Sequence, residues 1–333
     1  MTVQSATLLD PARASRPTGD YAVFGGVLRS ELPFVELDVA PCETPDWRLR
    51  IGVQPPAREG LLPCGERALG PEHYRLSRFD GGFRLEYSHA GIFDLELDSA
   101  TVTWYPRGEG DEHVELARSI VLGPMLALAL EARGHLCLHG GAVQLGDGAV
   151  AFVAPKHHGK STLVTALARS GARFISDDTL AVLPGAACVL RPGVNSARLW
   201  EDSARALRVD ELCDRVVDGI KTVASGFGEA APAGASLPLR AVYLLTPERD
   251  DADAPACRRT PLPPLAAAAT LAQQAKLPDT LVGFAAAGAR LALAARIASV
   301  VPVHRLHVAR SFARLPEVVA QLRAWHGDAT VPA

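Results

Sequence analysis

Residues 149–162 read AVAFVAPKHHGKST, and this stretch decides the fold. Its first five residues are all apolar, which is typical of a short strand that is covered on both faces of a sheet. A loop ending in Gly159 follows, and helical spacing of apolar residues then predicts a helix over Ser161–Arg169, ended by Gly171. The next apolar run predicts a strand over Arg173–Ser176. Strand, loop, helix and strand in this order indicate an α/β domain.

The loop itself predicts a phosphate-binding site. Apart from Ala154 in place of the first glycine, it follows the Walker A pattern G-x-x-x-x-G-K-[ST]. Gly159 lets successive N–H groups turn toward phosphate oxygens, and the helix start adds its positive dipole end. Lys160 then reaches the β- and γ-phosphates, and the Ser161 hydroxyl ligates Mg²⁺. The residues to which we assign nucleotide binding are Ala154, Pro155, Lys156, His157, His158, Gly159, Lys160, Ser161 and Thr162.

Two histidines inside the loop depart from the usual pattern. His157 and His158 either add hydrogen-bond donors to phosphate or point into solvent. Together with Ala154, they leave nucleotide affinity and nucleotide choice open.

Two carboxylates, Asp177 and Asp178, directly follow the strand over Arg173–Ser176. A βαβ crossover makes this strand parallel to the strand before the loop, so both carboxyl ends lie at one edge of the sheet. Ligands of open α/β sheets bind at that edge. One carboxylate is then placed to hold Mg²⁺, directly or through water, and the other to accept a proton.

A histidine, His139, lies on the strand that we expect over Cys137–Leu145, upstream of the loop. Taken alone, a strand histidine is more often a satisfied core residue than a functional one.

The N-terminal third of the chain predicts a different architecture. Strict alternation of apolar and polar residues predicts strands over Phe83–Ser88 and Phe93–Asp98, and Asp80-Gly81-Gly82 predicts a hairpin turn. The shorter candidate strands are Tyr21–Val27, Phe34–Val39, Arg48–Val53 and Val102–Tyr105. We therefore expect a β-rich docking or scaffold domain over residues 1–112 and a catalytic domain over residues 113–333.

The rest of the second domain alternates helices and strands. A helix is predicted from Glu112 to Arg133, with Gly134 as its C-cap. The expected elements after the two carboxylates are a loop over Pro247–Pro264, a helical region over Leu265–Val300, a strand over Val303–Val308 and a helix over Leu315–Ala324.

Composition limits the class of protein. The 34 Lys and Arg residues against 37 Asp and Glu give a net charge of −3, and 48% of the residues are apolar. This mixture excludes a disordered chain and a nucleic-acid binder that works through bulk basic charge. The six cysteines form no Cys-x-x-Cys pair, which fits reduced thiols. Because no signal-peptide core or charge-free apolar span of about 20 residues occurs, we expect a cytoplasmic protein without a membrane segment.

A resemblance joins these motifs. HGGAV, APKHHGKST and SGARFISDD, in this order between Leu138 and Val182, resemble the catalytic core of the HPr kinase/phosphorylase family. They look still closer to the HPr-kinase-like proteins of peptide-modifying gene clusters, including the lasso-peptide kinases. The resemblance implies an α/β fold with a P-loop kinase core of the HPr-kinase type, here preceded by the β-rich N-terminal domain. It also implies ATP and Mg²⁺ as cofactors and an assembly into homo-oligomers.

Carried over residue by residue, the resemblance implies the following roles. Lys160 binds the β/γ-phosphates and Ser161 binds Mg²⁺, with Asp177 supporting the metal or its waters. Asp178 is the general base for the acceptor hydroxyl, and His139 organises Asp178. Two weaker assignments are Lys221, as a further phosphate contact, and Glu201, as a stand-in for an acidic Mg²⁺ ligand of the family that this sequence does not show.

The function that follows is an ATP-dependent phosphotransferase acting on a hydroxyl, with serine of a peptide or small protein as the expected acceptor. A kinase of a small hydroxylated metabolite remains an alternative enzyme, because the sequence does not show the acceptor. A nucleotide-binding partner without transfer activity is an alternative of another class. A nucleotide-hydrolysing switch ranks last, because the chain lacks Asn-Lys-x-Asp and Leu-Ser-Gly-Gly-Gln.

Overall fold

The computed structural model describes residues 19–69, 72–108, 110–217 and 221–327. The protein is a mixed α/β structure with large β-sheets, and it divides into two compact units. The first unit comprises Met1–Arg133 and Leu277–Gly288, and the second comprises Gly134–Lys276 and Ala289–Ala333. The first unit thus extends beyond the boundary expected after residue 112, because it includes the helical segment that follows.

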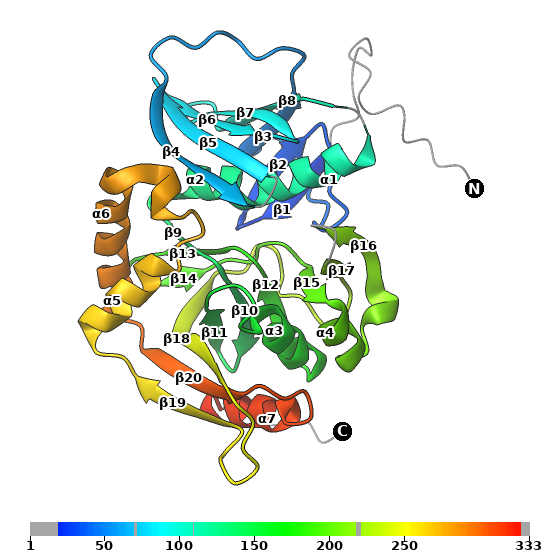
Figure 1. Cartoon of the computed structure of the whole chain (residues 1–333), viewed down its shortest axis with the longest axis vertical. Coiled ribbons are helices and arrows are strands. Elements are labelled where there is room, and N and C mark those ends of the chain that lie inside the picture. Colours follow the sequence, from blue (N-terminus) through cyan, green and yellow to red (C-terminus); the bar gives the residue numbers. More distant parts are fainter. Residues whose placement is uncertain (1–18, 70–71, 109, 218–220, 328–333) are drawn as a thin grey trace. The chain divides into compact units, whose positions relative to one another are not determined.

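The first unit is built on an eight-stranded sheet with the order β1-β2-β3-β8-β7-β6-β5-β4 (Figure 1). Its strands are β1 (Gly19–Val23), β2 (Gly26–Ser30), β3 (Trp47–Ile51), β4 (Leu62–Leu69), β5 (Glu72–Phe79), β6 (Gly82–Tyr87), β7 (Gly91–Glu96) and β8 (Thr101–Pro106). The predicted β-rich character of this part is confirmed, including the hairpin at Gly81, where φ is +77°.

Two strand predictions in this unit were wrong in detail. The segment Tyr21–Val27 is a hairpin, because the backbone reverses at Phe24 and Gly25, which both have positive φ. Phe34–Val39 forms turns and contributes only an isolated bridge to Tyr21. Phe34 and Leu37 are buried three residues apart, so this segment fills the core from a turn instead of pairing along its length.

A continuous helical segment ends the first passage of the chain through this unit. It consists of α1 (Asp111–Ile120), a π-helical turn η1 (Val121–Met125) and α2 (Leu126–Ala132). The predicted helix is confirmed, and Gly134 follows it with φ of +85°. This segment is long and apolar enough to cross a membrane, but 72% of its most apolar window is buried inside the structure, as in the core helix of a soluble protein.

The second unit is built on a nine-stranded sheet. The main path runs β12-β10-β11-β18-β14-β13-β9, and β20 pairs with β18 and with β19. The strands are β9 (Leu136–Leu138), β10 (Gly140–Leu145), β11 (Gly148–Val153), β12 (Arg173–Ser176), β13 (Leu180–Leu183), β14 (Val189–Leu190), β18 (Leu237–Glu248), β19 (Cys257–Pro261) and β20 (Val303–Ala309). A separate three-stranded sheet, β15-β17-β16, is formed by Ala197–Trp200, Lys221–Ala224 and Cys213–Val217.

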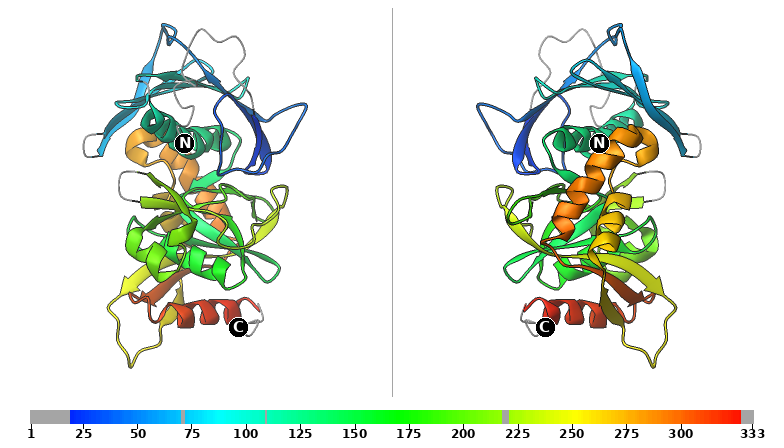
Figure 2. Two further views of the ribbon diagram at one scale, coloured as in Figure 1. Left: turned by 90° about the vertical axis from the view of Figure 1, so that its right-hand side faces the viewer. Right: turned by 90° about the vertical axis from the view of Figure 1, so that its left-hand side faces the viewer.

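Helices cover both faces of the large sheet (Figure 2). On one face, α3 (Lys160–Arg169) and α7 (Leu315–Trp325) pack in one hydrophobic cluster with Val150 and Phe152. On the other, α5 (Pro264–Gln273) and the last turns of α6 (Asp279–Ala298) pack in a second cluster with Ala151 and Val153. Every residue of β11 is buried, which confirms the expected strand covered on both sides. The remaining helices of the unit are α4 (Glu201–Ala206) and the 3₁₀ turn η2 (Asp210–Leu212).

Three sequence predictions in this unit need correction. The strand expected over Cys137–Leu145 is broken at His139, whose N–H donates to Gln274 O at 2.8 Å instead of joining the sheet. The loop expected over Pro247–Pro264 contains β19, which completes an edge beside β20. The helical region over Leu265–Val300 is two helices, α5 and α6.

The direction of β12 is the feature of this fold that positions the site. β12 and β11 are both antiparallel to β10, so they run in the same direction although β10 separates them. The crossover from β11 through α3 to β12 therefore brings the two carboxyl ends to one edge, as the sequence predicts.

Candidate functional site

The segment between β11 and α3 has the backbone geometry of an anion site. Gly159 is the N-cap of α3, with φ of +83°, and no side chain caps the first N–H groups of this helix. His157 also has positive φ, at +68°. Uncapped N–H groups at a helix start, preceded by a left-handed turn, attract negative charge. The role of this loop toward a nucleotide stays a prediction.

Lys160 lies inside this loop and is only 6% exposed. Its Nζ donates to Ala154 O at 2.8 Å and to Pro155 O at 3.1 Å. Burial lowers the pKa of Lys160 to about 8, against the opposing effect of Asp177 and Asp178. The ammonium is therefore still protonated at pH 7, and a phosphate group would offer it stronger acceptors than two carbonyls.

Asp177, at the end of β12, is 3% exposed. Burial and the charge of Asp178 raise the pKa of Asp177, and the Ser161 hydroxyl, the Arg198 N–H and Lys160 oppose this rise. Asp177 Oδ2 accepts from Arg198 N at 3.2 Å, whereas Oδ1 is buried without a hydrogen-bond partner. A buried carboxylate oxygen without a partner is unfavourable unless a ligand completes it.

Asp178 differs from its neighbour because basic side chains surround it. Its Oδ2 lies 2.7 Å from Lys276 Nζ and 3.7 Å from Arg198 Nη1, and its Oδ1 lies 3.3 Å from His139 Nδ1. Although burial acts to raise the pKa of Asp178, Lys276, Arg198 and His139 hold it well below its usual range. Asp178 is therefore an ionised carboxylate at any physiological pH.

The backbone of Asp178 is also unusual, with φ of +72°. His139 Nδ1 lies 3.1 Å from the Asp178 carbonyl oxygen, and Lys276 Nζ donates to the same oxygen at 3.3 Å. The break between β9 and β10 thus places His139 against both the backbone and the side chain of Asp178. The structure brings this predicted pair together, while their catalytic roles remain predictions.

Lys276 is a functional candidate that sequence reasoning missed. It follows α5, lies 98 residues from Asp178 along the chain, and has a side chain only 12% exposed. Its backbone N–H donates to Cys137 O at 2.8 Å, so the β9 strand holds it in place. No local pattern marks it, because only the packing of the α5–α6 connection beside β9 brings it to Asp178.

In a Lys276→Met variant, the carboxyl group of Asp178 should titrate at a higher pH than in the unmodified chain. The ammonium favours the ionised carboxylate, so its removal raises the pKa of Asp178 and protonation begins at a higher pH as the solution is acidified. Carbon NMR of the labelled Asp178 carboxyl group measures this directly. Lys276→Arg, which keeps the charge, should titrate close to the unmodified chain, and identical titrations of Lys276→Met and the unmodified chain would show that the ion pair is not formed in solution.

A cavity of about 610 Å³ gathers the loop and the two carboxylates. Its size is within the range of small-molecule sites. The predicted residues that line it are His139, Lys156, His157, His158, Gly159, Lys160, Ser161, Thr162, Asp177, Asp178 and Lys221. Ala154 and Pro155 contribute through the carbonyls that Lys160 contacts. Glu201, in contrast, is exposed and pairs with Arg205 at 2.6 Å.

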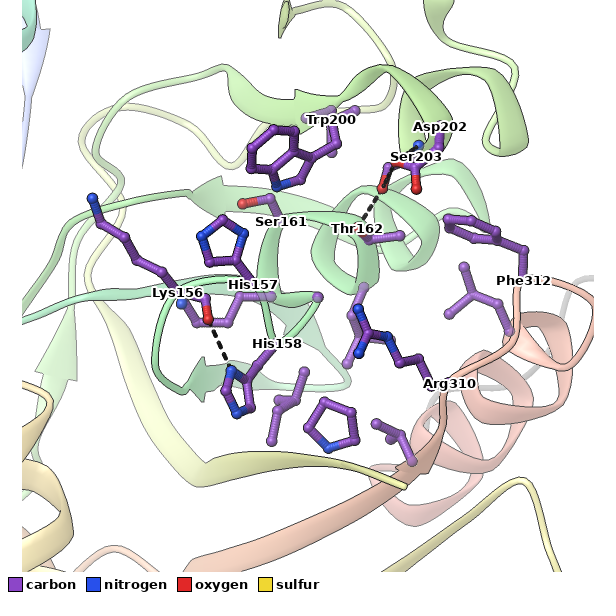
Figure 3. Close-up of a pocket in the computed structure, with 18 of the residues that line it drawn as sticks. Lys156, His157, His158, Ser161, Thr162, Trp200, Asp202, Ser203, Arg310 and Phe312 are labelled. Carbon is purple, nitrogen blue, oxygen red and sulfur yellow. Dashed lines mark hydrogen bonds between the residues drawn. The ribbon is translucent and has the colours of Figure 1, made fainter. Parts of the chain in front are cut away.

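The two loop histidines behave differently from each other (Figure 3). The centre of the His157 ring lies 5.3 Å from the centre of the Trp200 ring. Lys221, on the strand next to that of Trp200, has its Nζ 5.6 Å from the same ring centre. His158 Nδ1 lies 2.9 Å from Lys156 O, within its own loop. His157 therefore packs on an aromatic side chain, an option that the sequence did not suggest.

The donors at this edge fit a magnesium ion that is shared with phosphate. Mg²⁺ is typically held by one or two protein oxygens, with phosphate oxygens and water completing its shell. Ser161 and Asp177 supply two such oxygens, and the unpartnered Asp177 Oδ1 is available to a ligand. Within the part of the chain that the structure describes, no group of three or more His, Cys, Asp or Glu residues forms a metal site by itself.

Comparisons with known proteins give a distant structural relationship. The sequence matches no known protein family and no curated protein. Among solved structures, the Hpr(Ser) kinase/phosphatase from Coxiella burnetii is similar over 57% of this chain and 96% of that protein, with a TM-score of 0.28 and 10% sequence identity. The sequence resemblance thus rests on short motifs, and the structural similarity to a kinase of that type is remote.

Proposed function

We propose that this chain is an ATP-dependent kinase that transfers the γ-phosphoryl group to a hydroxyl, in the first place a serine of a peptide or small protein. The observation that carries the proposal is one cavity with two kinds of wall. The cavity is lined both by an uncapped helix start with a buried lysine and by two carboxylates of opposite pKa behaviour. Phosphoryl transfer needs positive groups that neutralise the phosphates, and carboxylates that hold the metal ion and orient the acceptor hydroxyl.

The loop and Lys160 are assigned to the phosphates. The N–H groups at the start of α3 and the Lys160 ammonium neutralise the β/γ-phosphate charge, and Lys160 exchanges its two carbonyl contacts for phosphate oxygens. Ser161 and Asp177 would hold Mg²⁺, which would supply positive charge to offset the charge of the phosphates when it is bound.

Asp178 is assigned to the acceptor hydroxyl. The acceptor oxygen forms a bond to the γ-phosphorus, the bond from this phosphorus to the β–γ bridging oxygen breaks, and the hydroxyl proton passes to Asp178. A carboxylate of low pKa is a weak base, but the proton leaves late in a loose transition state, so position matters more than basicity. His139, Lys276 and Arg198 fix that position.

Two kinds of partner are proposed for this chain, the acceptor and further copies of the chain. Assembly into a homo-oligomer is proposed from the sequence resemblance. Docking of the acceptor by the β-rich first unit is proposed because the sequence shows no catalytic constellation among the described residues of that unit.

The strength of the Asp178 ion pairs favours one alternative, a nucleotide-binding partner without transfer activity. A carboxylate neutralised by two cations could serve only to shape the cavity. Such a protein would bind ATP but leave every acceptor unchanged.

Mass spectrometry of candidate peptides separates the two functions. With ATP and Mg²⁺, the unmodified chain should add the mass of one phosphoryl group to a serine peptide, and the matching peptide with alanine should stay unchanged. ATP binding without modification of any peptide or small hydroxylated compound would favour the binding partner.

A further inference from the structure

The cavity extends from the end of β12, which carries Asp178, past the loop after β11 to the segment after β20, where no residue has yet been given a role. Phe312 lines it from the segment between β20 and α7, and its side chain is 45% exposed. Within the described part of the chain, no aromatic ring packs against it. An exposed phenyl ring inside a concave site is unfavourable in water and is a typical contact for a flat ligand.

Arg310 lies beside this ring. In Figure 3 its guanidinium group points into the cavity, between the loop with His158 and the ring of Phe312. The backbone N–H of Arg310 donates to Glu248 O at 2.9 Å, which anchors it, and none of the described residues pairs with the guanidinium. A cation without a carboxylate partner in a pocket is available to a ligand.

The start of α3 gives the cavity a direction. Thr162 comes one residue after Ser161 and, in Figure 3, lies on the side toward Phe312. In the strand order β12-β10-β11-β18, with β20 beyond β18, Asp178 after β12 and Phe312 after β20 lie on opposite sides of the loop that follows β11. The reacting phosphate is assigned to the Asp178 side. A nucleoside triphosphate whose γ-phosphate faces Asp178 therefore extends its α-phosphate, ribose and base toward Thr162 and Phe312.

The apolar floor of this end agrees with a base. Val308 of β20 and Leu315 and Val318 of α7 line it, and Val318 is buried in the cluster that also contains Leu163 of α3. Flat heterocycles are commonly held by stacking on aromatic rings and on arginine guanidinium planes.

We propose that Phe312 and Arg310 form the base subsite of this cavity and hold a purine ring between the phenyl ring and the guanidinium plane. This inference rests on the proposed nucleotide-dependent function and extends it to residues that lie far from the Walker A pattern in the sequence. It assigns nucleotide affinity to two sources, the loop for the phosphates and the β20–α7 connection for the base.

Calorimetric titration with two probes tests the subsite. The probes are ATP and inorganic tripolyphosphate, both with Mg²⁺, because only ATP carries a base. Phe312→Ala should weaken ATP binding about 5- to 150-fold, the effect of about 1–3 kcal/mol for stacking of a base on an aromatic ring. Tripolyphosphate binding should stay unchanged. Phe312→Tyr, which keeps an aromatic ring, should retain normal ATP affinity. Leu265→Ala, which removes an exposed apolar side chain from α5, should change the affinity for neither probe.

The other possible results of these titrations separate a failure of the base subsite from a failure of the proposed function. Phe312→Ala with unchanged ATP affinity, or with equal losses for both probes, would overturn the base subsite while leaving the kinase proposal intact. Arg310→Gln with equal losses for both probes would overturn the stacking role of Arg310. A chain that binds tripolyphosphate but shows no preference for ATP would also overturn the subsite, whereas an unmodified chain that binds neither probe would overturn the proposed function together with it.

Discussion

Lys160→Ala should lower ATP affinity by about 10- to 150-fold, because a hydrogen bond to a charged group contributes about 1.5–3 kcal/mol. Lys160 is the buried cation of the loop, and its ammonium is enclosed by the backbone that would surround the phosphates. Phosphoryl transfer at saturating ATP should fall by a further factor of about 10²–10³, as when one preorganised donor is removed from a transition state. Titration at pH 7, below the Lys160 pKa of about 8, measures the first effect.

Arg240→Ala is the matched control for the loss of a positive charge. Arg240 is exposed on β18 and pairs with Asp147, in the turn that precedes β11, away from the loop at the other end of that strand. This variant should keep normal ATP affinity. Near-normal affinity and turnover in Lys160→Ala would remove the loop from nucleotide binding altogether.

Asp178→Asn should keep ATP binding and lose transfer by a factor of about 10²–10⁴, the usual contribution of a positioned general base. Asparagine has nearly the same size and tolerates the left-handed backbone of this position, where φ is +72°. Lys276 Nζ retains its contact with the carbonyl oxygen of residue 178 at 3.3 Å, so the local fold has support after the charge is lost. Single-turnover kinetics with saturating ATP and Mg²⁺ separate binding from transfer.

Two further variants define the meaning of this result. Asp177→Asn should raise the Mg²⁺ concentration needed for half-maximal rate more than it lowers the saturated rate, because Asp177 is assigned to the metal. Asp147→Asn, at an exposed carboxylate outside the cavity, should leave both unchanged. If Asp178→Asn retained full transfer, the base would have to be another group, and if it lost ATP binding, Asp178 would be a metal ligand.

The sequence predicts the parts of the site that lie close together in the chain. The apolar run of β11, Gly159 before α3 and the carboxylates after β12 are local patterns, and the structure has each of these elements where they are expected. It also predicts the shared direction of β11 and β12, because a helix crossover leaves few other arrangements. It does not predict that β10 lies between them, since strand order depends on packing across the whole sheet.

The residues that complete the cavity come from distant segments without a recognisable motif. Lys276 follows the alanine-rich helix α5, and Arg310 and Phe312 lie in the short connection after β20. The β19 strand reads CRRTP, which alternation does not mark as a strand, and in the structure it pairs with β20. Such contributions depend on tertiary contacts, which single-sequence patterns do not contain.

The most direct test of the central claim is a crystal structure of the chain with a non-hydrolysable ATP analogue and Mg²⁺. The account predicts the β- and γ-phosphates at the N–H groups that begin α3, with Lys160 Nζ turned from the carbonyls of Ala154 and Pro155 to phosphate oxygens. The γ-phosphate should face Asp178, and Ser161 and Asp177 should face the metal. An analogue bound outside this cavity, or a cavity left empty at saturating analogue, would contradict the account.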